Sequence, residues 1–300
     1  MTDPSSAPSG PAADSAPAIS LVVSTIGRPD ALRTLLASVE SGTRRHAVEV
    51  VVVDQSDDRS CLDVVAAWTG AVPVRGTTSP RGATVGRNAG ARLAAGRVVA
   101  FPDDNAWYPV DTLDRAVDVL DRRSDLAAVS GVQHTPDGRP SMLRWAADAT
   151  TVSGTNLHRT VIESSLFLRR TTFEAIGGFD ESIGVGSPGP YQSGEAADLV
   201  MRVLETGSAI WYDPTLVVLQ DDPRDDIDER FVTKMAGYGA GFGYVHRAHR
   251  LPAWLFAVFM ARKGAAVVVR GVRGQRVLAR ADATFLRSAV RGYRDAASAG

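Results

Sequence analysis

The sequence predicts an α/β protein with a mostly parallel sheet that helices flank on both faces. Short apolar runs, beginning with 19–24 and 48–53, alternate with stretches of helical periodicity. Continuous apolar strands separated by helices are typical of parallel sheets covered on both sides. Polar clusters follow three of these runs, at 25–28, 54–56 and 103–105. Because ligands bind outside the carboxyl ends of such strands, the clusters indicate a site at one sheet edge.

The first third of the chain carries the clearest pattern. Asp30 is expected to cap a helix whose apolar residues repeat at helical spacing up to Val39. The predicted strands of this part are 19–24, 48–53, 72–74 and the run that ends at Phe101. The predicted helices are 30–39, 61–68 and 83–95.

The second half of the predicted fold is more irregular. Helices are expected at 113–120, 172–176 and 195–205, and strands at 126–132, 210–212 and 216–219, with an apolar run at 161–168 and a Gly/Pro-rich loop at 179–193. The loop contains a G-x-G-x-x-G match at 184–189. A dinucleotide-binding loop must open a helix, and the Pro-Gly-Pro sequence at 188–190 prevents this, so we expect no nucleotide cradle there.

The composition is that of a soluble globular protein, with 44% apolar and 22% charged residues among 300. Cys61 is the single cysteine, which excludes an intrachain disulfide and fits a cytoplasmic location. Residues 1–18 lack the basic start and apolar centre of a signal peptide. We therefore expect them to form a disordered tail.

Charge is distributed unevenly along the chain. Residues 231–300 hold 12 basic and 2 acidic residues, a net charge of +10, whereas the rest holds 21 and 32, a net charge of −11. Such asymmetry indicates an anionic partner for the basic end. The segment 251–294 also carries aromatic residues between its basic ones, as interfacial helices on anionic lipid do. A helix packed on the body explains the pattern equally well, and without a recognition motif we expect no nucleic acid partner.

The most informative motif is FPDDN at 101–105, where an apolar run ends in two adjacent carboxylates. Aspartate is depleted from strands, and neighbouring anions repel each other. A divalent cation between Asp103, Asp104 and a bound phosphate explains both carboxylates, since Mg²⁺ and Mn²⁺ prefer oxygen ligands. A turn is the simpler explanation of the same residues. The other two polar strand ends favour the metal site.

The chain resembles the family 2 glycosyltransferases of the GT-A fold over about residues 19–222. The resemblance is carried by an ordered set of motifs: ISLVVSTIGRP at 19–29, VVVVDQS at 50–56, GRNAG at 86–90, FPDDN at 101–105, GGFD at 177–180 and GEAADL at 194–199, followed by Arg202. It implies a GT-A catalytic domain at 19–230, with a nucleotide-binding half at 19–105 and an acceptor half at 106–230. The basic helical region at 231–300 lies outside it.

The resemblance also implies a function. It indicates inverting transfer of a sugar from a nucleotide diphosphate sugar to a glycan or lipid-linked acceptor, in cell-envelope or polysaccharide synthesis, with Mg²⁺ or Mn²⁺. The enzyme would work in the cytoplasm or on the inner face of the plasma membrane. Matching positions place Thr25, Asp54 and Gln55 at the base and ribose, Arg87 near the phosphates, Asp103 at the ribose or metal and Asp104 on the metal. For Arg28, phosphate contact and plain exposure are equally compatible with the sequence.

Inverting transfer requires a general base, and a carboxylate is the usual choice. Glu195 is the leading candidate, and Asp198, three residues on along the same helix face, is the second. The family commonly has an acidic pair at 195–196, whereas this chain has Ala196. A helix-terminal acid that stabilises the helix dipole also explains Glu195.

A second departure concerns the metal shell. Many relatives carry a histidine after the last strand, where this chain has Gln220, Asp221 and Asp222. Asp221 is the candidate third ligand, although weak metal binding or loss of activity also fits. The alternative function is therefore a non-catalytic relative that binds a nucleotide sugar. A nucleotidyltransferase fits less well, because 25–29 is a poor phosphate loop.

Overall fold

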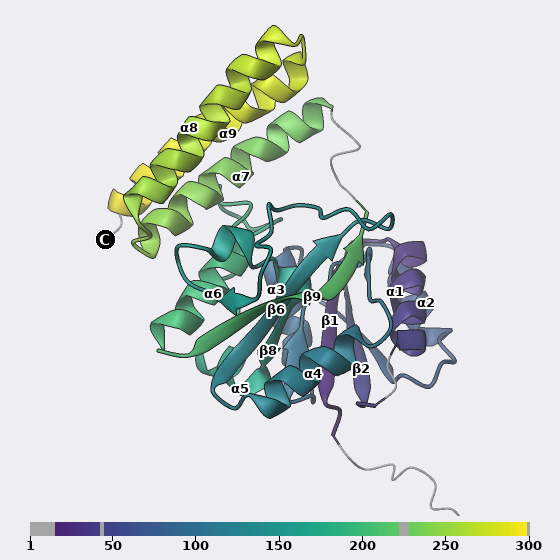
Figure 1. Cartoon of the computed structure of the whole chain (residues 1–300). Coiled ribbons are helices and arrows are strands. Elements are labelled where there is room, and N and C mark those ends of the chain that lie inside the picture. The colour runs from purple at the N-terminus through teal and green to yellow at the C-terminus, as the bar shows by residue number, and fades with distance from the viewer. Residues whose placement is uncertain (1–15, 43–44, 222–227, 299–300) are drawn as a thin grey trace, which may run out of the picture.

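The computed structural model describes residues 16–42, 45–221 and 228–298. Within these ranges the chain folds around a nine-stranded sheet (Figure 1). The strands are β1 (Ile19–Thr25), β2 (Val48–Asp54), β3 (Val74–Thr78), β4 (Val98–Ala100), β5 (Ala106–Trp107), β6 (Leu126–His134), β7 (Thr150–Thr151), β8 (Leu166–Arg169) and β9 (Ala209–Gln220). The helices are α1 (Pro29–Gly42), α2 (Ser60–Ala66), α3 (Ala83–Ala91), α4 (Thr112–Arg122), α5 (Arg170–Ala175), α6 (Glu195–Glu205), α7 (Glu229–Ala248), α8 (Ala253–Val272) and α9 (Arg276–Ser298), with short 3₁₀ turns η1 (Leu157–Arg159) and η2 (Glu163–Ser165).

The strands follow the order β3-β2-β1-β4-β8-β6-β9-β5, and β7 pairs with β9. Strands β1 to β4 are parallel, as the sequence predicts. In the second half, β8 runs antiparallel to both β4 and β6, and β5 runs antiparallel to β9. These antiparallel pairs bring segments from the second half of the chain to the strand ends of the first.

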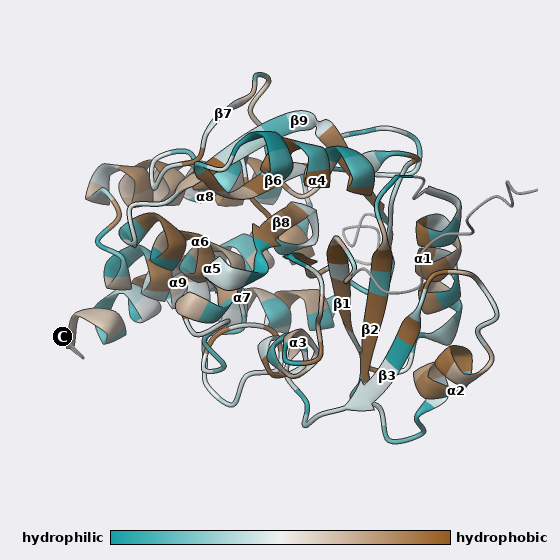
Figure 2. Cartoon of the chain, turned by 90° about the horizontal axis from the view of Figure 1, so that it is seen from below, coloured by the Kyte–Doolittle hydropathy of each residue, from teal (hydrophilic) through white to brown (hydrophobic). Residues whose placement is uncertain are grey.

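Two apolar cores lie on opposite faces of the sheet. In β1, Leu21 and Val23 belong to the core that includes α1 and α4, while Val22 belongs to the core that includes α6. Because successive side chains of a strand point to opposite faces, one uncharged strand supplies both cores. Figure 2 shows the resulting hydrophobic β1 and β2 between their covering helices.

Several predicted elements differ from the observed ones. The third strand is 74–78 and not 72–74, because this edge strand is half-exposed and lacks an apolar run to mark it. The strands predicted at 210–212 and 216–219 are one strand, β9. Asp213 and Pro214 interrupt its apolar pattern, and a shift in the pairing with β6 between Ser130 and Val132 keeps it in the sheet.

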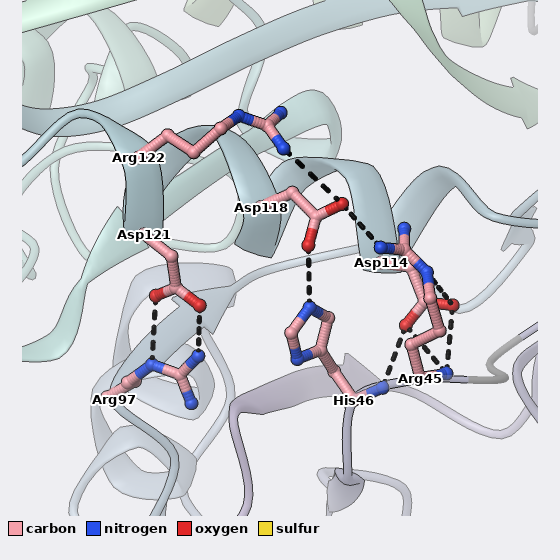
Figure 3. Close-up of polar contacts among 7 residues, drawn as sticks. All are labelled: Arg45, His46, Arg97, Asp114, Asp118, Asp121 and Arg122. Carbon is pink, nitrogen blue, oxygen red and sulfur yellow. Dashed lines mark hydrogen bonds and ion pairs between the residues drawn. The ribbon is translucent and has the colours of Figure 1, made fainter.

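Helix α4 is tied to the sheet by carboxylates on one of its faces (Figure 3). Asp114 accepts hydrogen bonds from the backbone N–H groups of Arg45 and His46, just before β2. Asp118 accepts from the His46 ring at 2.8 Å, and Asp121 binds Arg97 through two hydrogen bonds just before β4. These contacts hold the chain segments that lead into β2 and β4 against the same helix.

The three C-terminal helices run side by side outside the sheet, and α7 lies nearest to it (Figure 1). A Cβ atom on Gly243 of α7 would overlap the carbonyl oxygen of Ala289 in α9, so the two backbones touch. Helix α8 has no buried residue and exposes Trp254, Val268 and Val272. None of the helices in the described ranges combines the length and apolar character that a membrane crossing needs.

Most of the tail predicted at 1–18 lies outside the described residues. Its end belongs to the fold, since Ala18 is buried and its N–H group donates to Ala47 O at 2.7 Å. The folded body therefore begins slightly earlier than predicted.

Candidate active site

The two carboxylates after β4 lie at the carboxyl edge of the parallel strands. The register of β1 and β2 places Thr25 opposite Asp54 at this edge. Asp104 is buried, and its Oδ2 atom accepts a hydrogen bond from Thr25 Oγ1 at 2.7 Å. Its Oδ1 atom forms an ion pair with Arg28 Nη2 at 3.0 Å. Thr25 and Arg28, from the first polar strand end, thus meet Asp104 from the third, as the sequence indicates.

Asp103 is held by two residues that are distant in sequence. Arg87, on α3, donates from Nη2 to Asp103 Oδ1 at 3.0 Å. Gln220, at the end of β9, donates from Nε2 to Asp103 Oδ2 at 3.1 Å and to Asn105 Oδ1 at 3.0 Å. The β5–β9 pairing places Ala106 opposite Gln220 and so brings this side chain to the motif.

Arg87 lies inside a ring of three carboxylates, formed by Asp103, Glu163 and Glu195, which we call the carboxylate ring. Its guanidinium lies 3.7 Å from Glu163 Oε1 and 3.6 Å from Glu195 Oε1, and it stacks over Phe179. Burial opposes the charge on Arg87, but the three carboxylates outweigh it and raise its pKa. Arg87 is therefore a fixed cation at the centre of the site.

The two glutamates of the ring lie beside the same cation, Arg87, and their ionisation is coupled. Burial and the neighbouring Glu195 raise the pKa of Glu163 to about 7. Burial is also the main cause that raises the pKa of Glu195, although Arg87 opposes it. A raised pKa suits a carboxylate that has to take up a proton during a reaction.

Glu163 and Tyr238 are site residues that the sequence does not reveal. Glu163 lies in η2 just before β8, within a stretch of irregular loops. Tyr238 lies on α7, and burial together with Glu195 and Glu163 raises its pKa. No local pattern marks either residue, because both reach the site through tertiary packing. In the sequence, glycine at every second position of 237–243 indicates that this segment packs closely against another part of the backbone, as α7 does.

Asp198, the second candidate base, lies in a different network. Its Oδ2 atom accepts from Arg202 Nε at 2.9 Å, and its Oδ1 atom lies 2.9 Å from His249 Nε2. Burial would raise the pKa of Asp198, but the hydrogen bonds from His249 and Arg202 lower it. The structure therefore places Glu195 beside Arg87 and engages Asp198 in a contact between α6 and the end of α7.

Asp54 and Gln55 support the loops of the site. Asp54 is fully buried, and its carboxylate accepts from the N–H groups of Ser56, Cys61 and Leu62 at the start of α2. Gln55 receives a hydrogen bond from Ser24 and donates to the carbonyl oxygens of Pro80 and Gly82, just before α3. The polar side-chain atoms of Asp54 and Gln55 are therefore bound by other groups of the protein itself.

Asp221, the predicted third metal ligand, follows β9 directly and is exposed. The residue of this segment that contacts the FPDDN motif is the neighbouring Gln220, through its hydrogen bond to Asp103. Asp222, named with it, lies outside the described residues. No group of three or more His, Cys, Asp or Glu side chains in the described ranges is arranged to hold a metal.

Two buried oxygens at the motif nevertheless suit a cation. Asp104 Oδ1 and Gln220 Oε1 accept no hydrogen bond within the described residues. Burial raises the pKa of Asp104, although the hydrogen bond from Thr25 and the charge of Arg28 oppose it, and a metal cation would stabilise the charged form further. Arg87 Nη1 also has no hydrogen-bond acceptor in these ranges, and Glu195 Oε1 lies 3.6 Å from it. One or two carboxylates completed by substrate phosphates is the usual arrangement for Mg²⁺.

The G-x-G-x-x-G match at 184–189 lies in the loop between α5 and α6 and does not open a helix, as predicted. The loop packs on the start of α3, where Ala83 N–H donates to Val185 O at 2.9 Å and Thr84 donates to Ile183 O at 3.2 Å. It covers the helix that carries Arg87.

Comparison with known proteins places these residues in a family. The profile of glycosyl transferase family 2 matches residues 20–179. A glucosyl-dolichyl phosphate glucuronosyltransferase from Haloferax volcanii is 28% identical over 142 residues. That alignment covers 44% of this chain and 45% of the relative, so the chain matches less than half the length of this curated protein.

Two solved structures share the fold. The mannosyltransferase PcManGT from Pyrobaculum calidifontis, in complex with GDP-Man and Mn²⁺, has a TM-score of 0.62 and 20% identity over 94% of this chain and 88% of its own. S. aureus TarS 1–349, in complex with UDP-GlcNAc, has a TM-score of 0.57 and 15% identity over 94% of this chain and 92% of its own.

Proposed function

The chain belongs to glycosyl transferase family 2, and from this we propose that it is an inverting, metal-assisted glycosyltransferase that uses a nucleotide diphosphate sugar. The observation that carries the proposal is the carboxylate ring around Arg87, which joins Asp103, the first of the two aspartates after β4, to Glu195. A fixed cation, a buried oxygen set and a carboxylate of raised pKa then lie in one site.

The nucleotide would bind along the carboxyl edge of β1, β2 and β4. We assign Thr25, Arg28 and Asp103 to the nucleotide and its phosphates, with Arg87 facing the diphosphate. Asp54 and Gln55 would act mainly by shaping the loops after β2 and before α3, since their polar atoms already bind the chain. Residues 19–105 are the proposed nucleotide-binding half, and 106–230 the acceptor half.

Asp104 is the proposed metal ligand, because its Oδ1 atom is buried and has only the ion pair with the half-exposed Arg28 as a partner in the described ranges. Asp103 and Asp221 are further candidates. When bound, Mg²⁺ or Mn²⁺ would stabilise the negative charge that develops on a diphosphate leaving group. Arg87 would contribute to the same stabilisation from its fixed position.

Glu195 is the proposed general base. In inverting transfer one carboxylate removes the proton of the acceptor hydroxyl as that oxygen attacks the sugar from the face opposite the diphosphate. Glu195 lies 3.6 Å from Arg87, and burial raises its pKa, so its carboxylate binds a proton more readily than an exposed glutamate does. Glu163 adds a second negative charge, and this charge increases the affinity of the ring for a proton.

The experiment is a titration of UDP-sugars and GDP-sugars with and without Mn²⁺, followed by donor hydrolysis and transfer. We expect binding that Mn²⁺ strengthens, and slow hydrolysis of the accepted donor. Asp104→Asn should remove the effect of Mn²⁺ on binding. Asp30→Asn, at an exposed carboxylate on α1, is the matched control and should retain it. Full activity and unchanged Mn²⁺ dependence in Asp104→Asn would refute the metal role.

A second candidate is a relative that binds a nucleotide sugar without turnover. Gln220 supports it, because its amide nitrogen binds Asp103 at a position where many relatives have a histidine. Mn²⁺-dependent binding without any hydrolysis or transfer across the donor panel would favour this candidate.

The acceptor would be a glycan or a lipid-linked sugar of the cell envelope, handled at the inner face of the plasma membrane. The basic helices at 251–294 would contact anionic lipid through the exposed apolar residues of α8. Binding to phosphatidylglycerol vesicles at low salt, lost at high salt, is the expected result. A protein that ignores such vesicles would refute the membrane contact.

A further inference from the structure

A cavity of about 630 Å³ lies between the C-terminal helices and the segment 142–159, outside the carboxylate ring. One wall is formed by α7 and α8, and the other by residues around η1. We call it the C-terminal cavity. We propose that it binds a long-chain lipid phosphate, as the site for the lipid-phosphate part of the acceptor; this role rests on the transferase function proposed above.

The walls of the cavity are apolar. Leu143, Phe242, Leu255, Val258 and Phe259 line it, and Val258 is half-exposed although it is aliphatic. Phe242 and Phe259 lie with ring centroids 4.3 Å apart and form a continuous aromatic floor. These five side chains offer no hydrogen bonds to a sugar or a nucleotide, but they suit a hydrocarbon chain.

The same cavity is strongly cationic. Its lining includes five basic side chains, Arg144, Arg159, Arg262, Lys263 and Arg270, and one acidic side chain, Asp282. Lys263 and Arg270 both bind Asp282, at 2.6 Å and 2.5 Å. Within the described ranges no carboxylate pairs with Arg144, Arg159 or Arg262. Three cations thus remain for an anion beside an apolar wall, which is the charge pattern that a lipid phosphate complements.

One residue that lines this cavity carries a buried polar atom without a partner in the described ranges. His158 lines it from η1, and its Nε2 atom is buried and has no hydrogen-bond partner in the described ranges. Burial and the stacked His246 lower the pKa of His158 to about 3, so its ring is neutral at physiological pH. A neutral imidazole can donate one hydrogen bond to a phosphate oxygen or accept one from a hydroxyl.

Each wall is connected along the chain to a residue at the carboxylate ring. On α7, Tyr238 belongs to the site, and Phe242, one helical turn or about 6 Å further on, lines the cavity. On the other wall, His158 lies five residues before Glu163. An amphiphile held by its phosphate in the cavity would therefore place a sugar beyond that phosphate near Glu163 and Glu195.

The test is calorimetric titration of the full-length protein, without donor, with farnesyl phosphate below its micelle concentration. Farnesol and inorganic phosphate are the two partial probes. We expect farnesyl phosphate to bind at least tenfold more tightly than either one, since only it engages both the apolar wall and the cations. Farnesyl phosphate that binds no better than inorganic phosphate would overturn the proposal.

Four variants of exposed positions locate the site. Val258→Asp and Arg262→Glu alter the cavity, while Val268→Asp and Arg273→Glu make the same changes at or near α8 positions outside its lining. We expect a loss of tenfold or more in farnesyl phosphate affinity for the first pair and less than twofold for the second. Equal losses in both pairs would show adsorption to the helix surface and would overturn the proposal.

Donor hydrolysis by the same proteins separates the two hypotheses. Hydrolysis by the wild-type protein without farnesyl phosphate binding would refute the lipid-phosphate site and leave the transferase proposal intact. Binding that only the cavity variants lose, together with no hydrolysis of any donor, would support the site and refute the transferase activity.

Discussion

Gln220 donates a hydrogen bond from Nε2 to Asp103 Oδ2 at 3.1 Å, across 117 residues of sequence. Its other contact, to Asn105 Oδ1 at 3.0 Å, fixes the residue on the far side of Asp104. The side-chain amide of Gln220 thus binds the residues on both sides of Asp104. Its neighbour Asp221 is exposed and contributes no comparable contact in the described ranges.

Gln220→Ala should lower the free energy of unfolding by about 1–3 kcal/mol, because it leaves a carboxylate oxygen of Asp103 without its donor. Asp221→Ala, at the adjacent exposed position, should change it by less than about 0.5 kcal/mol. Urea unfolding of both variants measures the difference. Equal losses would mean that the end of β9 is sensitive as a whole and that the Asp103 contact is not the cause.

Glu195→Gln should reduce kcat by about 10²–10⁴-fold while leaving donor affinity nearly unchanged, because the amide cannot accept the acceptor proton. Asp198→Asn should reduce stability through the lost contacts with Arg202 and His249 and retain most of kcat per folded molecule. Steady-state kinetics on folded protein distinguish them. The opposite pattern would transfer the base role to Asp198.

The pH dependence of kcat/KM should show an ascending limb above the usual titration range of glutamate. The base must be unprotonated to act, and burial raises the pKa of Glu195. Glu163→Gln removes a neighbouring negative charge, so the pKa of Glu195 should fall and the limb should move to lower pH. A limb that stays in place would show that Glu163 does not couple to the base.

His249→Gln should destabilise the protein by about 1 kcal/mol at pH 5.5 and by less at about pH 8.5. The contacts with Asp198 and Glu205 raise the pKa of His249, so its contribution is complete below its unfolded pKa of about 6.5 and lost as pH rises through the higher folded value. The pKa of Asp198 is lowered, so its contribution is lost only at acidic pH. Urea unfolding at the two pH values tests the sign, and a larger effect at the higher pH would contradict it.

Gly243→Ala should lower the free energy of unfolding by about 1–3 kcal/mol, because the added methyl group overlaps the Ala289 carbonyl and separates α7 from α9. Gly264→Ala is the matched control in α8, where a Cβ meets no atom within 4 Å. It should stabilise the protein by up to about 1 kcal/mol through helix propensity. Thermal unfolding compares them, and destabilisation by both changes would argue against the backbone contact as the cause.

The strand pattern of the first half of the chain is sufficient to predict that some of the candidate residues lie together. Thr25, Asp103 and Asp104 follow uncharged strands, and the parallel topology brings them to one edge, where Asp104 receives the hydrogen bond from Thr25. The sequence also places Glu195 at the start of a helix, where the structure has it. These features follow from local periodicity, which a single sequence displays.

The partners of these residues were not predictable in the same way. Glu163 and Tyr238 carry no local signal. In the sequence, Gln220 stands out only because many relatives have a histidine at this position, and its hydrogen bond to Asp103 is not predicted. The sequence predicts Asp54 at the base and ribose and Asp198 as the second candidate base, and in the structure both carboxylates bind chain segments around them. Whether a polar side chain faces a ligand or its own backbone depends on neighbours far along the chain.

The sequence by itself determined the alternation of strands and helices and the edge at which the parallel strands present their polar ends, because burial on both faces of a sheet imposes a repeating apolar pattern. The tertiary structure decided which charges surround Arg87 and what lies beside α8. The antiparallel pairings of β8 and β5 and the close approach of α7 to α9 bring these groups together, and such long-range contacts leave no periodic trace in the sequence.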